Sequence, residues 1–106
     1  MDRELELGNN YYYGEGVPFD LKLAAEHYAA SDTDEARCYL GYMYREGIGV
    51  EKDLKKAFEL FTEAAPGFAM VEFNLGLMYE KGLYVEKDPQ KAAAYFESAK
   101  QRGYWE

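Results

Sequence analysis

The sequence predicts an all-α fold, an α/α solenoid in which three helix-turn-helix units stack one on the next. The first observation behind this prediction is an internal repeat, because the stretch LGYMYREGIGVEKDLKKAFELFTEAA at residues 40–65 recurs in related form at residues 7–25 and 75–93. The second is a helical pattern, because apolar residues of segment 54–65 recur at steps of three and four. Such units cannot bury their apolar sides alone, so arrays of them stack into one curved rod. We therefore predict a single repeat domain over residues 1–106, with units 1–32, 33–67 and 68–106.

Each unit is predicted to contain two antiparallel helices, here called the A helix and the B helix. The glycine-rich segment between them ends the A helix, and an aspartate opens the B helix. The six predicted helices span, in chain order, residues 2–13, 21–31, 35–46, 54–65, 69–81 and 89–101.

Three repeated positions explain how each helix pair is built. A glycine inside a helix costs about 1 kcal/mol relative to alanine, so we expect the glycine of each A helix to mark a close approach of the B helix. Glycines six residues later allow positive φ and end the A helix. Aspartates twelve residues after the helix glycine stand at the N-cap of the B helix, where a cap stabilises by about 1 kcal/mol. In chain order, the helix glycines are Gly8, Gly41 and Gly76, the terminating glycines are Gly14, Gly47 and Gly82, and the aspartates are Asp20, Asp53 and Asp88.

The units also differ from one another at the joints and in the third loop. The segment 31–34 (SDTD) predicts a short turn rich in capping residues, whereas the Pro-Gly pair at 66–67 predicts a firmer break. Tyr84 stands where the other loops have Gly16 and Gly49. Because tyrosine tolerates positive φ poorly, we predict a different backbone in the third loop.

The charge of the chain narrows the class of partner. The net charge is −8, of which the first unit carries −5, the second −2 and the third −1. An acidic chain without a basic cluster is repelled by phosphate backbones and by anionic lipids, which argues against nucleic acid and membrane partners. A basic peptide or protein surface fits better, although solubility alone would also explain an acidic surface.

Compartment is predicted from three features of the sequence. Cys38 is the only cysteine, so no disulfide can form within the chain, which favours a reducing compartment. The first ten residues, MDRELELGNN, contain no signal-peptide pattern, and no apolar run reaches the length of a membrane span. We expect a cytoplasmic protein.

The repeated residues resemble the Sel1-like repeat family, a branch of the tetratricopeptide-type helical repeats. The resemblance rests on the pattern LG-x-x-Y-x-x-G-x-G-V-x-x-D-x-x-x-A followed by an aromatic residue, and it covers essentially the whole chain. It implies a right-handed superhelix with A helices on the inner face and B helices outside. It also implies an adaptor or scaffold that holds partner proteins, in a family with many bacterial members.

The sequence does not predict an enzyme, a cofactor or a metal site. His27 is the only histidine, and no cysteine or histidine cluster accompanies it, so we interpret it as a partly exposed helix residue. No nucleophile motif is present, and the GEG and GIG loops lack the lysine and hydroxyl residue of a phosphate-binding loop. Cys38 has acidic neighbours, so we interpret it as an apolar contact rather than a reactive thiol.

A second face of the A helices is the candidate binding surface. It lies about 100° around each helix from the face that meets the B helix. Its residues in the three units are Asn9, Tyr12 and Tyr13, then Cys38, Tyr42 and Arg45, and finally Met70, Phe73, Leu77 and Lys81. Leu5 also falls on this face in the first unit, but Leu5 and Phe73 could instead pack between adjacent A helices. Tyr39 and Glu35 lie at the margin of this face.

Three functions follow in order of support. The first is a non-enzymatic protein-interaction module that binds a peptide or protein in a concave tyrosine-lined groove, whose acidic edges favour a basic partner. The second is self-assembly, as a homodimer or a longer stack, through terminal helices that lack a dedicated cap, unless Tyr104 and Trp105 fold back over the last B helix. The third is a small-molecule hydrolase, which no constellation of residues supports.

Overall fold

The computed structural model of the protein describes residues 2–64 and 68–104, and within these ranges it contains six α-helices and no strand. The helices are α1 (Arg3–Tyr13), α2 (Leu21–Ala30), α3 (Asp34–Glu46), α4 (Leu54–Glu63), α5 (Ala69–Lys81) and α6 (Pro89–Gln101). Every predicted helix is present, and each end lies within two residues of its predicted position.

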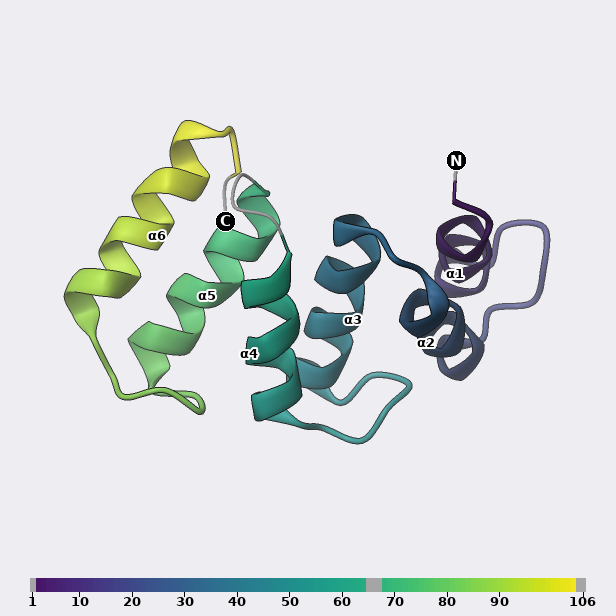
Figure 1. The fold of residues 1–106 in the computed structure, drawn as a ribbon, viewed down its shortest axis with the longest axis horizontal. Coiled ribbons are helices and arrows are strands. Elements are labelled where there is room, and N and C mark those ends of the chain that lie inside the picture. Colours follow the sequence, from purple (N-terminus) through teal and green to yellow (C-terminus); the bar gives the residue numbers. More distant parts are fainter. Residues whose placement is uncertain (1, 65–67, 105–106) are drawn as a thin grey trace.

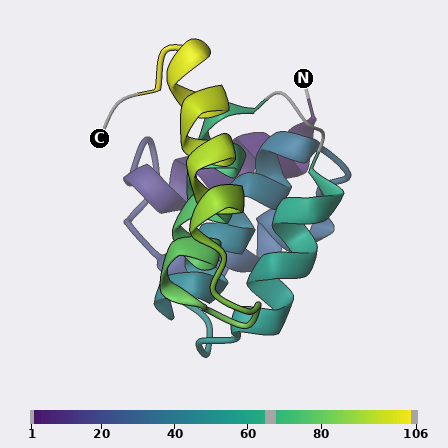
Figure 2. The same ribbon diagram turned by 90° about the vertical axis from the view of Figure 1, so that its left-hand side faces the viewer.

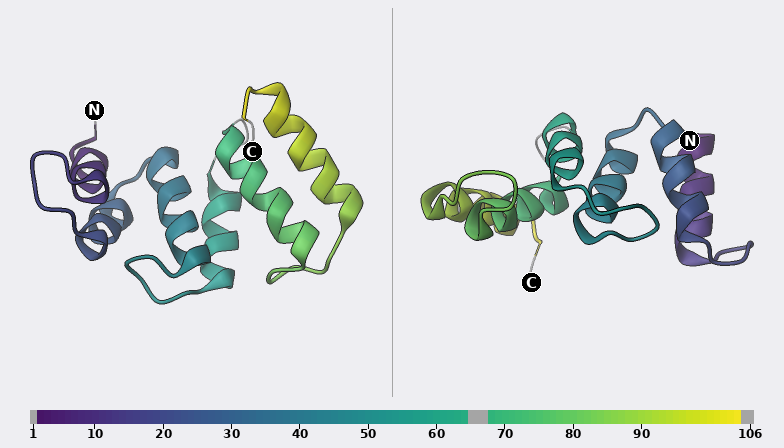
Figure 3. Two further views of the ribbon diagram at one scale, coloured as in Figure 1. Left: turned by 180° about the vertical axis from the view of Figure 1, so that it is seen from behind. Right: turned by 90° about the horizontal axis from the view of Figure 1, so that it is seen from below.

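The helices form three hairpins that follow one another along the molecule. In Figure 1 the hairpin of α1 and α2 is seen nearly end-on, whereas α5 and α6 lie close to the plane of the view, so successive hairpins are rotated. Figure 3 shows the same open arrangement from behind and from below, and Figure 2 looks along the array from its α6 end, so that the hairpins overlap. The molecule measures 42 × 27 × 23 Å along its principal axes. This is the predicted all-α repeat solenoid.

The hydrophobic core is divided between the two joints of the array. One cluster joins the first unit to the second, and its buried members are Leu5, Ala24, Ala25, Tyr28, Ala36, Leu40 and Met43. The other joins the second unit to the third, and its buried members are Cys38, Ala57, Phe61, Ala64, Val71, Leu75 and Met78. Helix α3 contributes to both clusters, so the middle hairpin holds the array together.

The glycine inside each A helix lies against an aromatic ring of the B helix, which confirms the predicted close approach of the two helices. A Cβ atom built on Gly8 would stand 2.6 Å from the Tyr28 ring, and one built on Gly41 would stand 2.7 Å from the Phe61 ring. In the third unit, Gly76 stands in the same relation to Phe96, at 2.7 Å. Contacts this short leave no room for a methyl group, which explains a glycine where the helix alone would favour alanine.

The loops between A and B helices repeat the same hydrogen bonds in all three units. Each terminating glycine is in the left-handed region, with φ of 70° at Gly14, 70° at Gly47 and 68° at Gly82. Each aspartate cap then accepts a hydrogen bond at 3.0 Å from the backbone N–H three residues later, which confirms the predicted caps at Asp20, Asp53 and Asp88.

The prediction of a different backbone at Tyr84 is wrong. Tyr84 has φ of 69°, close to the 77° of Gly16 and the 72° of Gly49. The reason is that the backbone hydrogen bonds at both ends of the loop are the same as in the other units, so they impose the same path on a less suitable residue. Its exposed ring packs beside Phe58, with 5.6 Å between centroids.

The joint between the first two units is a capped turn, as predicted. The Thr33 hydroxyl accepts a hydrogen bond from the Ala36 N–H at 3.2 Å, so Thr33 is the N-cap of α3. The hydroxyl groups of Ser31 and Thr33 lie 2.9 Å apart. The predicted break at residues 66–67 lies outside the described residues. None of the helices in ranges 2–64 and 68–104 has the length and apolar character that spanning a membrane requires.

Candidate functional site

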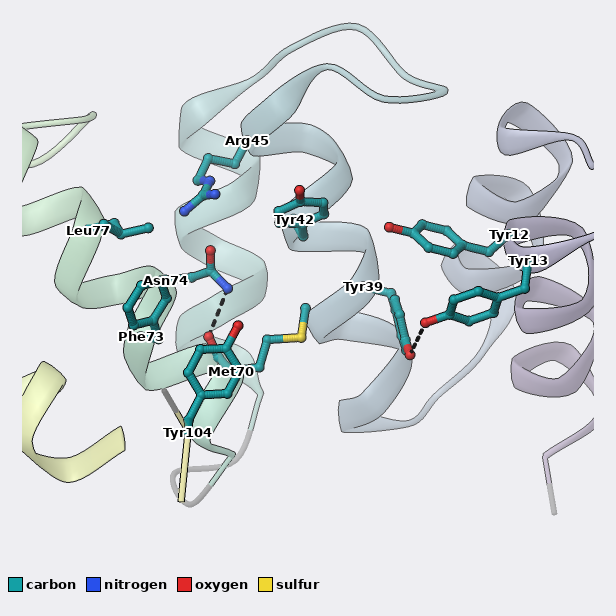
Figure 4. A pocket seen from close by; sticks show the side chains of 10 residues that line it. All are labelled: Tyr12, Tyr13, Tyr39, Tyr42, Arg45, Met70, Phe73, Asn74, Leu77 and Tyr104. Carbon is teal, nitrogen blue, oxygen red and sulfur yellow. Dashed lines mark hydrogen bonds between the residues drawn. The ribbon is translucent and has the colours of Figure 1, made fainter. Parts of the chain in front are cut away.

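A groove of about 450 Å³ runs across the side of the molecule formed by the three A helices. Its lining comes from α1, α3 and α5 and from the segment after α6, and Figure 4 shows these residues converging from both ends. The lining residues are Tyr12, Tyr13, Tyr39, Tyr42, Arg45, Met70, Phe73, Asn74, Leu77 and Tyr104.

Helix geometry explains why these positions meet in one groove. Residues three and four apart share a helix face, so Tyr39 and Tyr42 point the same way from α3, as do Met70, Asn74 and Leu77 from α5. This face lies beside the one that carries the helix glycine and packs on the B helix.

A cluster of tyrosines forms the wall of the groove nearest α1. The hydroxyl groups of Tyr13 and Tyr39 lie 2.8 Å apart, which joins α1 to α3 across the first joint. The Tyr12 ring meets the Tyr39 ring edge-on, with centroids 5.4 Å apart. Beneath them, the buried Tyr28 ring stacks on Tyr39 at 5.1 Å. Rings held at such distances stabilise one another by about 0.5–1.5 kcal/mol per pair beyond their burial.

Tyr39 and Tyr12 stay protonated at physiological pH. Burial raises the pKa of Tyr39 above its ordinary value, and the hydrogen bond with Tyr13 adds to this shift. Burial likewise raises the pKa of Tyr12, with further contributions from Tyr42 and Tyr13. The hydroxyl groups are therefore neutral and can both donate and accept hydrogen bonds.

The opposite wall of the groove is more apolar and comes mainly from α5. Phe73 lies at its centre, with its ring 5.4 Å from Phe96 of α6 and 5.1 Å from Tyr104. Figure 1 shows the backbone turning back from α6 toward α5, and this turn brings Tyr104 onto the groove. The Asn74 side-chain amide donates to the backbone oxygen of Met70 at 2.8 Å.

Arg45 supplies the positive charge of the groove lining. Its Nε donates to a carboxylate oxygen of Glu46 at 2.9 Å. Its guanidinium carbon lies 5.3 Å from the centre of the Tyr42 ring, a cation–π distance.

Seven of the ten residues predicted for the binding face line the groove. They are Tyr12, Tyr13, Tyr42, Arg45, Met70, Phe73 and Leu77. Of the two residues with an alternative packing role, Leu5 is buried in the first core cluster, whereas Phe73 reaches the groove while it also contacts α6.

The prediction is wrong for Cys38, which is only 3% exposed and belongs to the second core cluster. It lies one turn before Gly41 on the face that packs against α4 and α5, so it cannot meet a partner. Cys38 holds the repeat position of Leu5, three residues before the helix glycine, and both are buried.

Asn9 and Lys81 also lie off the groove. The Asn9 side-chain oxygen accepts a hydrogen bond from the Tyr28 hydroxyl at 2.6 Å, so this amide is directed to α2 instead. Lys81 is the exposed last residue of α5, one turn beyond Leu77 and past the end of the groove.

Three lining residues were not among those predicted for this face. Tyr39 had been placed at the margin, and its repeat position, two residues before the helix glycine, is also that of Asn74. A comparison of this position across the units would have identified both Tyr39 and Asn74 as candidate groove residues. Tyr104 has no counterpart in the repeat, so no periodicity could have indicated it.

Two further predictions concern His27 and the end of the sequence. His27 is half-buried, with Nδ1 2.7 Å from a carboxylate oxygen of Glu4 and its ring stacked on Tyr11 at 5.6 Å. In ranges 2–64 and 68–104 no group of three or more histidine, cysteine, aspartate and glutamate residues could hold a metal ion. Tyr104 packs on the groove rather than over α6, and Trp105 lies outside the described residues.

Comparison with known proteins decides the family. The family model described as Sel1 repeat matches three successive segments, residues 4–31, 34–65 and 69–104. The chain belongs to the Sel1 repeat family. The resemblance drawn from the sequence is thereby confirmed, and each matched segment contains one of the three helix hairpins.

Solved Sel1 repeat structures share the fold over nearly the whole length of this protein. A protective antigen present in uropathogenic Escherichia coli strains, which displays an SLR fold, is 33% identical with a TM-score of 0.86 over 95% of this chain and 22% of its own. A Sel1 repeat protein from Oxalobacter formigenes is 32% identical with a TM-score of 0.84, over 94% of this chain and 42% of its own.

Curated relatives are much longer than the region they share with this protein. Protein sel-1 homolog 2 of Mus musculus is 38% identical over 65 residues, which are 58% of this chain and 9% of that protein. The alginate biosynthesis protein AlgK of Pseudomonas syringae pv. tomato is 40% identical over 75 residues, 68% of this chain and 16% of that protein. Sel1-repeat proteins generally mediate protein–protein interactions, and the family fold is a scaffold for them.

Proposed function

We propose that this protein is a non-enzymatic binding module that holds an extended segment of another protein in the tyrosine-lined groove. One observation carries the proposal: residues from all three A helices and from the segment after α6 converge on one concavity of about 450 Å³. A groove that spans all three units can contact an extended partner along the length of the array, as expected for a repeat protein.

The chemistry of the lining supports a peptide as the occupant. Five tyrosines offer large apolar faces with hydroxyl groups at their edges, and tyrosine is enriched at the centres of protein interfaces. Met70 and Leu77 add flexible apolar surface on the other wall. An apolar or aromatic side group of the partner would fill the space between the two walls.

The charges around the groove support basic residues on either side of that anchor. The protein as a whole carries −8. Glu46 lies beside the groove, bonded to Arg45, and the charge of Glu35 acts on the hydroxyl of Tyr39. Lysine or arginine in the flanking parts of the partner would lie in this negative field.

Selection of a randomised peptide library displayed on phage tests the proposal. Leu77→Asp places a charge on the apolar wall and Tyr13→Ala removes an exposed ring from the other, so both should weaken the selected peptides by about tenfold or more. Phe19→Ala is the matched control, because Phe19 is 64% exposed and does not line the groove.

Two outcomes would reject the groove as the binding surface. In one, the selected peptides bind the Leu77→Asp and Tyr13→Ala variants as tightly as the unchanged protein. In the other, backbone amide signals of the B helices shift on titration while those of the groove residues stay in place.

We infer a second candidate function, self-assembly through α6. Ala93 and Ala94 are exposed on this helix, and Tyr104 packs on the groove rather than over them. Two small exposed residues let another helix hairpin, from a second copy of the protein, approach α6 closely. Light scattering over a concentration series should then show a dimer that Ala93→Glu abolishes, and a monomer at every concentration would reject this function.

A further inference from the structure

The most informative residue in the groove is Arg45, because one of its side-chain nitrogens has no acceptor among the described residues. Its side chain is only 12% exposed and lines the groove between Tyr42 and Leu77. Its Nε is bonded to Glu46. Its Nη1 is buried and has no hydrogen-bond partner among residues 2–64 and 68–104.

An enclosed guanidinium nitrogen without an acceptor is unfavourable. Arginine has five N–H donors and no acceptor, and nearly all buried polar groups in folded proteins find a partner. Leaving such a group unsatisfied costs about 1–3 kcal/mol, and more when the group is charged. Arg45 lines the groove, so a ligand that brings an acceptor to it would remove this cost, provided that the guanidinium turns its buried Nη1 toward the groove.

Asn74 adds an acceptor next to this donor. Its amide nitrogen donates to the backbone oxygen of Met70, and since a carbonyl oxygen can only accept, the assignment of the amide is determined. The side-chain oxygen therefore faces the other way, and Figure 4 shows it directed toward the Arg45 guanidinium. The floor of the groove thus offers an N–H donor and an oxygen acceptor close together.

This pair does not favour a carboxylate. Glu46 already neutralises Arg45 from 2.9 Å, and a ligand carboxylate would bring a second negative charge beside it as well as lone pairs against the Asn74 oxygen. A group with one acceptor and one donor, and no charge, satisfies both sides. In an extended polypeptide, the C=O and N–H of one residue point to the same side and form such a pair.

We propose that Arg45 and Asn74 are the polar anchor of the groove and hold the backbone of an extended peptide segment, with its carbonyl oxygen on Arg45 and its N–H on the Asn74 oxygen. This rests on the proposed function and deepens it, because it assigns backbone recognition to the floor and side-group recognition to the tyrosine and α5 walls. The partner is then selected by its apolar anchor and its ability to extend rather than by an acidic residue.

Two small probes that differ in one group test the proposal. N-acetyl-tyrosine N-methylamide carries a ring for the groove and the backbone carbonyl and N–H of an extended residue. N-acetyl-tyrosine replaces its second amide with a carboxylate. In nitrogen-15 NMR titrations of the protein, we expect the diamide to shift the Arg45 Nε–Hε signal and to bind several-fold more tightly than the acid.

Variants assign the effect to the two anchor residues. Arg45→Gln and Asn74→Ala should each weaken diamide binding by about tenfold, the size of one hydrogen bond to a charged or buried partner. Lys81→Ala is the control on the same helix as Asn74 and should bind as the unchanged protein does. Circular dichroism and the amide spectrum establish that each variant is folded before it is titrated.

Three results would overturn this anchor. They are tighter binding of the acid than of the diamide, equal binding of the diamide by the unchanged and variant proteins, and no shift at Arg45 up to the solubility limit of the diamide. The proposed function fails separately, when the library yields no peptide whose binding depends on Leu77 and Tyr13.

Discussion

The helix glycines show how the absence of one side chain sets the distance between two helices. A Cβ atom built on Gly41 would stand only 2.7 Å from the Phe61 ring, and Phe61 is completely buried. The ring then fills the second core cluster, so the same contact that joins α3 to α4 also supplies the surface on which the third unit packs.

We predict that Gly41→Ala destabilises the protein. The new methyl group would overlap the Phe61 ring, and overpacking of this kind costs about 1–3 kcal/mol. The better helix propensity of alanine returns about 1 kcal/mol of this. Urea denaturation followed by circular dichroism measures the net effect. The same change in a Phe61→Leu background should cost less, since the smaller residue leaves room for the methyl group, and equal costs in both backgrounds would contradict the packing argument.

We predict that the Cys38 thiol is protected in the folded protein and that its burial makes stability fall at high pH. Burial, followed by the charges of Asp34 and Glu35, raises the pKa of this thiol to about 12. In the unfolded chain a cysteine thiol has a pKa of about 8.5. Between these values the folded state holds a proton that the unfolded state has lost, so the free energy of unfolding decreases as pH rises, while below this range the thiol contributes no pH dependence.

Labelling with a disulfide reagent at pH 8 measures this protection. The folded protein should react at least about a hundredfold more slowly than the protein in urea, because only the thiolate attacks the reagent. A Tyr42→Cys variant that also carries Cys38→Ala is the control, since its thiol lines the groove and should react quickly. Rapid labelling of Cys38 in the folded protein would contradict its burial and would support its predicted place on the binding surface.

At the scale of the helices, the sequence predicts what is decided locally. The aspartate caps and terminating glycines act within one turn, so all six helices could be predicted from the residues alone, with ends within two residues of those observed. The groove depends on the distance between neighbouring units, and this distance cannot be derived from one sequence. Cys38 and Tyr39 are adjacent on α3, yet one is buried in the second joint while the other lies on the groove. The prediction for Tyr84 failed for the opposite reason. The hydrogen bonds of the whole loop outweighed the local preference of tyrosine for negative φ.

The hairpin of α5 and α6 is held by a buried carboxylate, and we predict that Glu72→Ala loosens it. Glu72 is 9% exposed, accepts a hydrogen bond from the Ser98 hydroxyl at 2.8 Å and accepts another from Arg102 Nε at 2.9 Å. Removing it should cost about 1–3 kcal/mol, chiefly because the half-buried Ser98 hydroxyl loses its acceptor, whereas water can solvate the more exposed Arg102. Amide hydrogen exchange should quicken in α6 and remain unchanged in α1 and α2.

Glu80→Ala is the matched control for this helix pair, because Glu80 lies on the same helix and is exposed. It should leave both stability and exchange nearly unchanged, as most surface substitutions do. Equal effects of the two substitutions would show that the carboxylate of Glu72 is not what holds α6.

At the scale of the whole molecule, the uneven distribution of charge makes the two ends of the groove electrostatically different. The first unit carries −5 and the third −1, so the basic flank of a bound segment is attracted most strongly toward the α1 end. Glu6 is the acid best placed to act there, because it holds in α1 the repeat position that Tyr39 and Asn74 hold on the groove.

We predict that a groove-binding peptide with lysines at one end associates more slowly as salt is added. The screening length falls from about 10 Å at 0.1 M salt to about 3 Å at 1 M, so the association rate should drop by roughly tenfold over this range while the dissociation rate changes less. Glu6→Gln should reproduce part of this loss at low salt. Glu97→Gln, which removes a charge that is also exposed but lies on α6, should have a smaller effect. Stopped-flow fluorescence measures both rates, and an association rate that is independent of salt and of Glu6 would show that the acidic surface serves solubility and not the choice of partner.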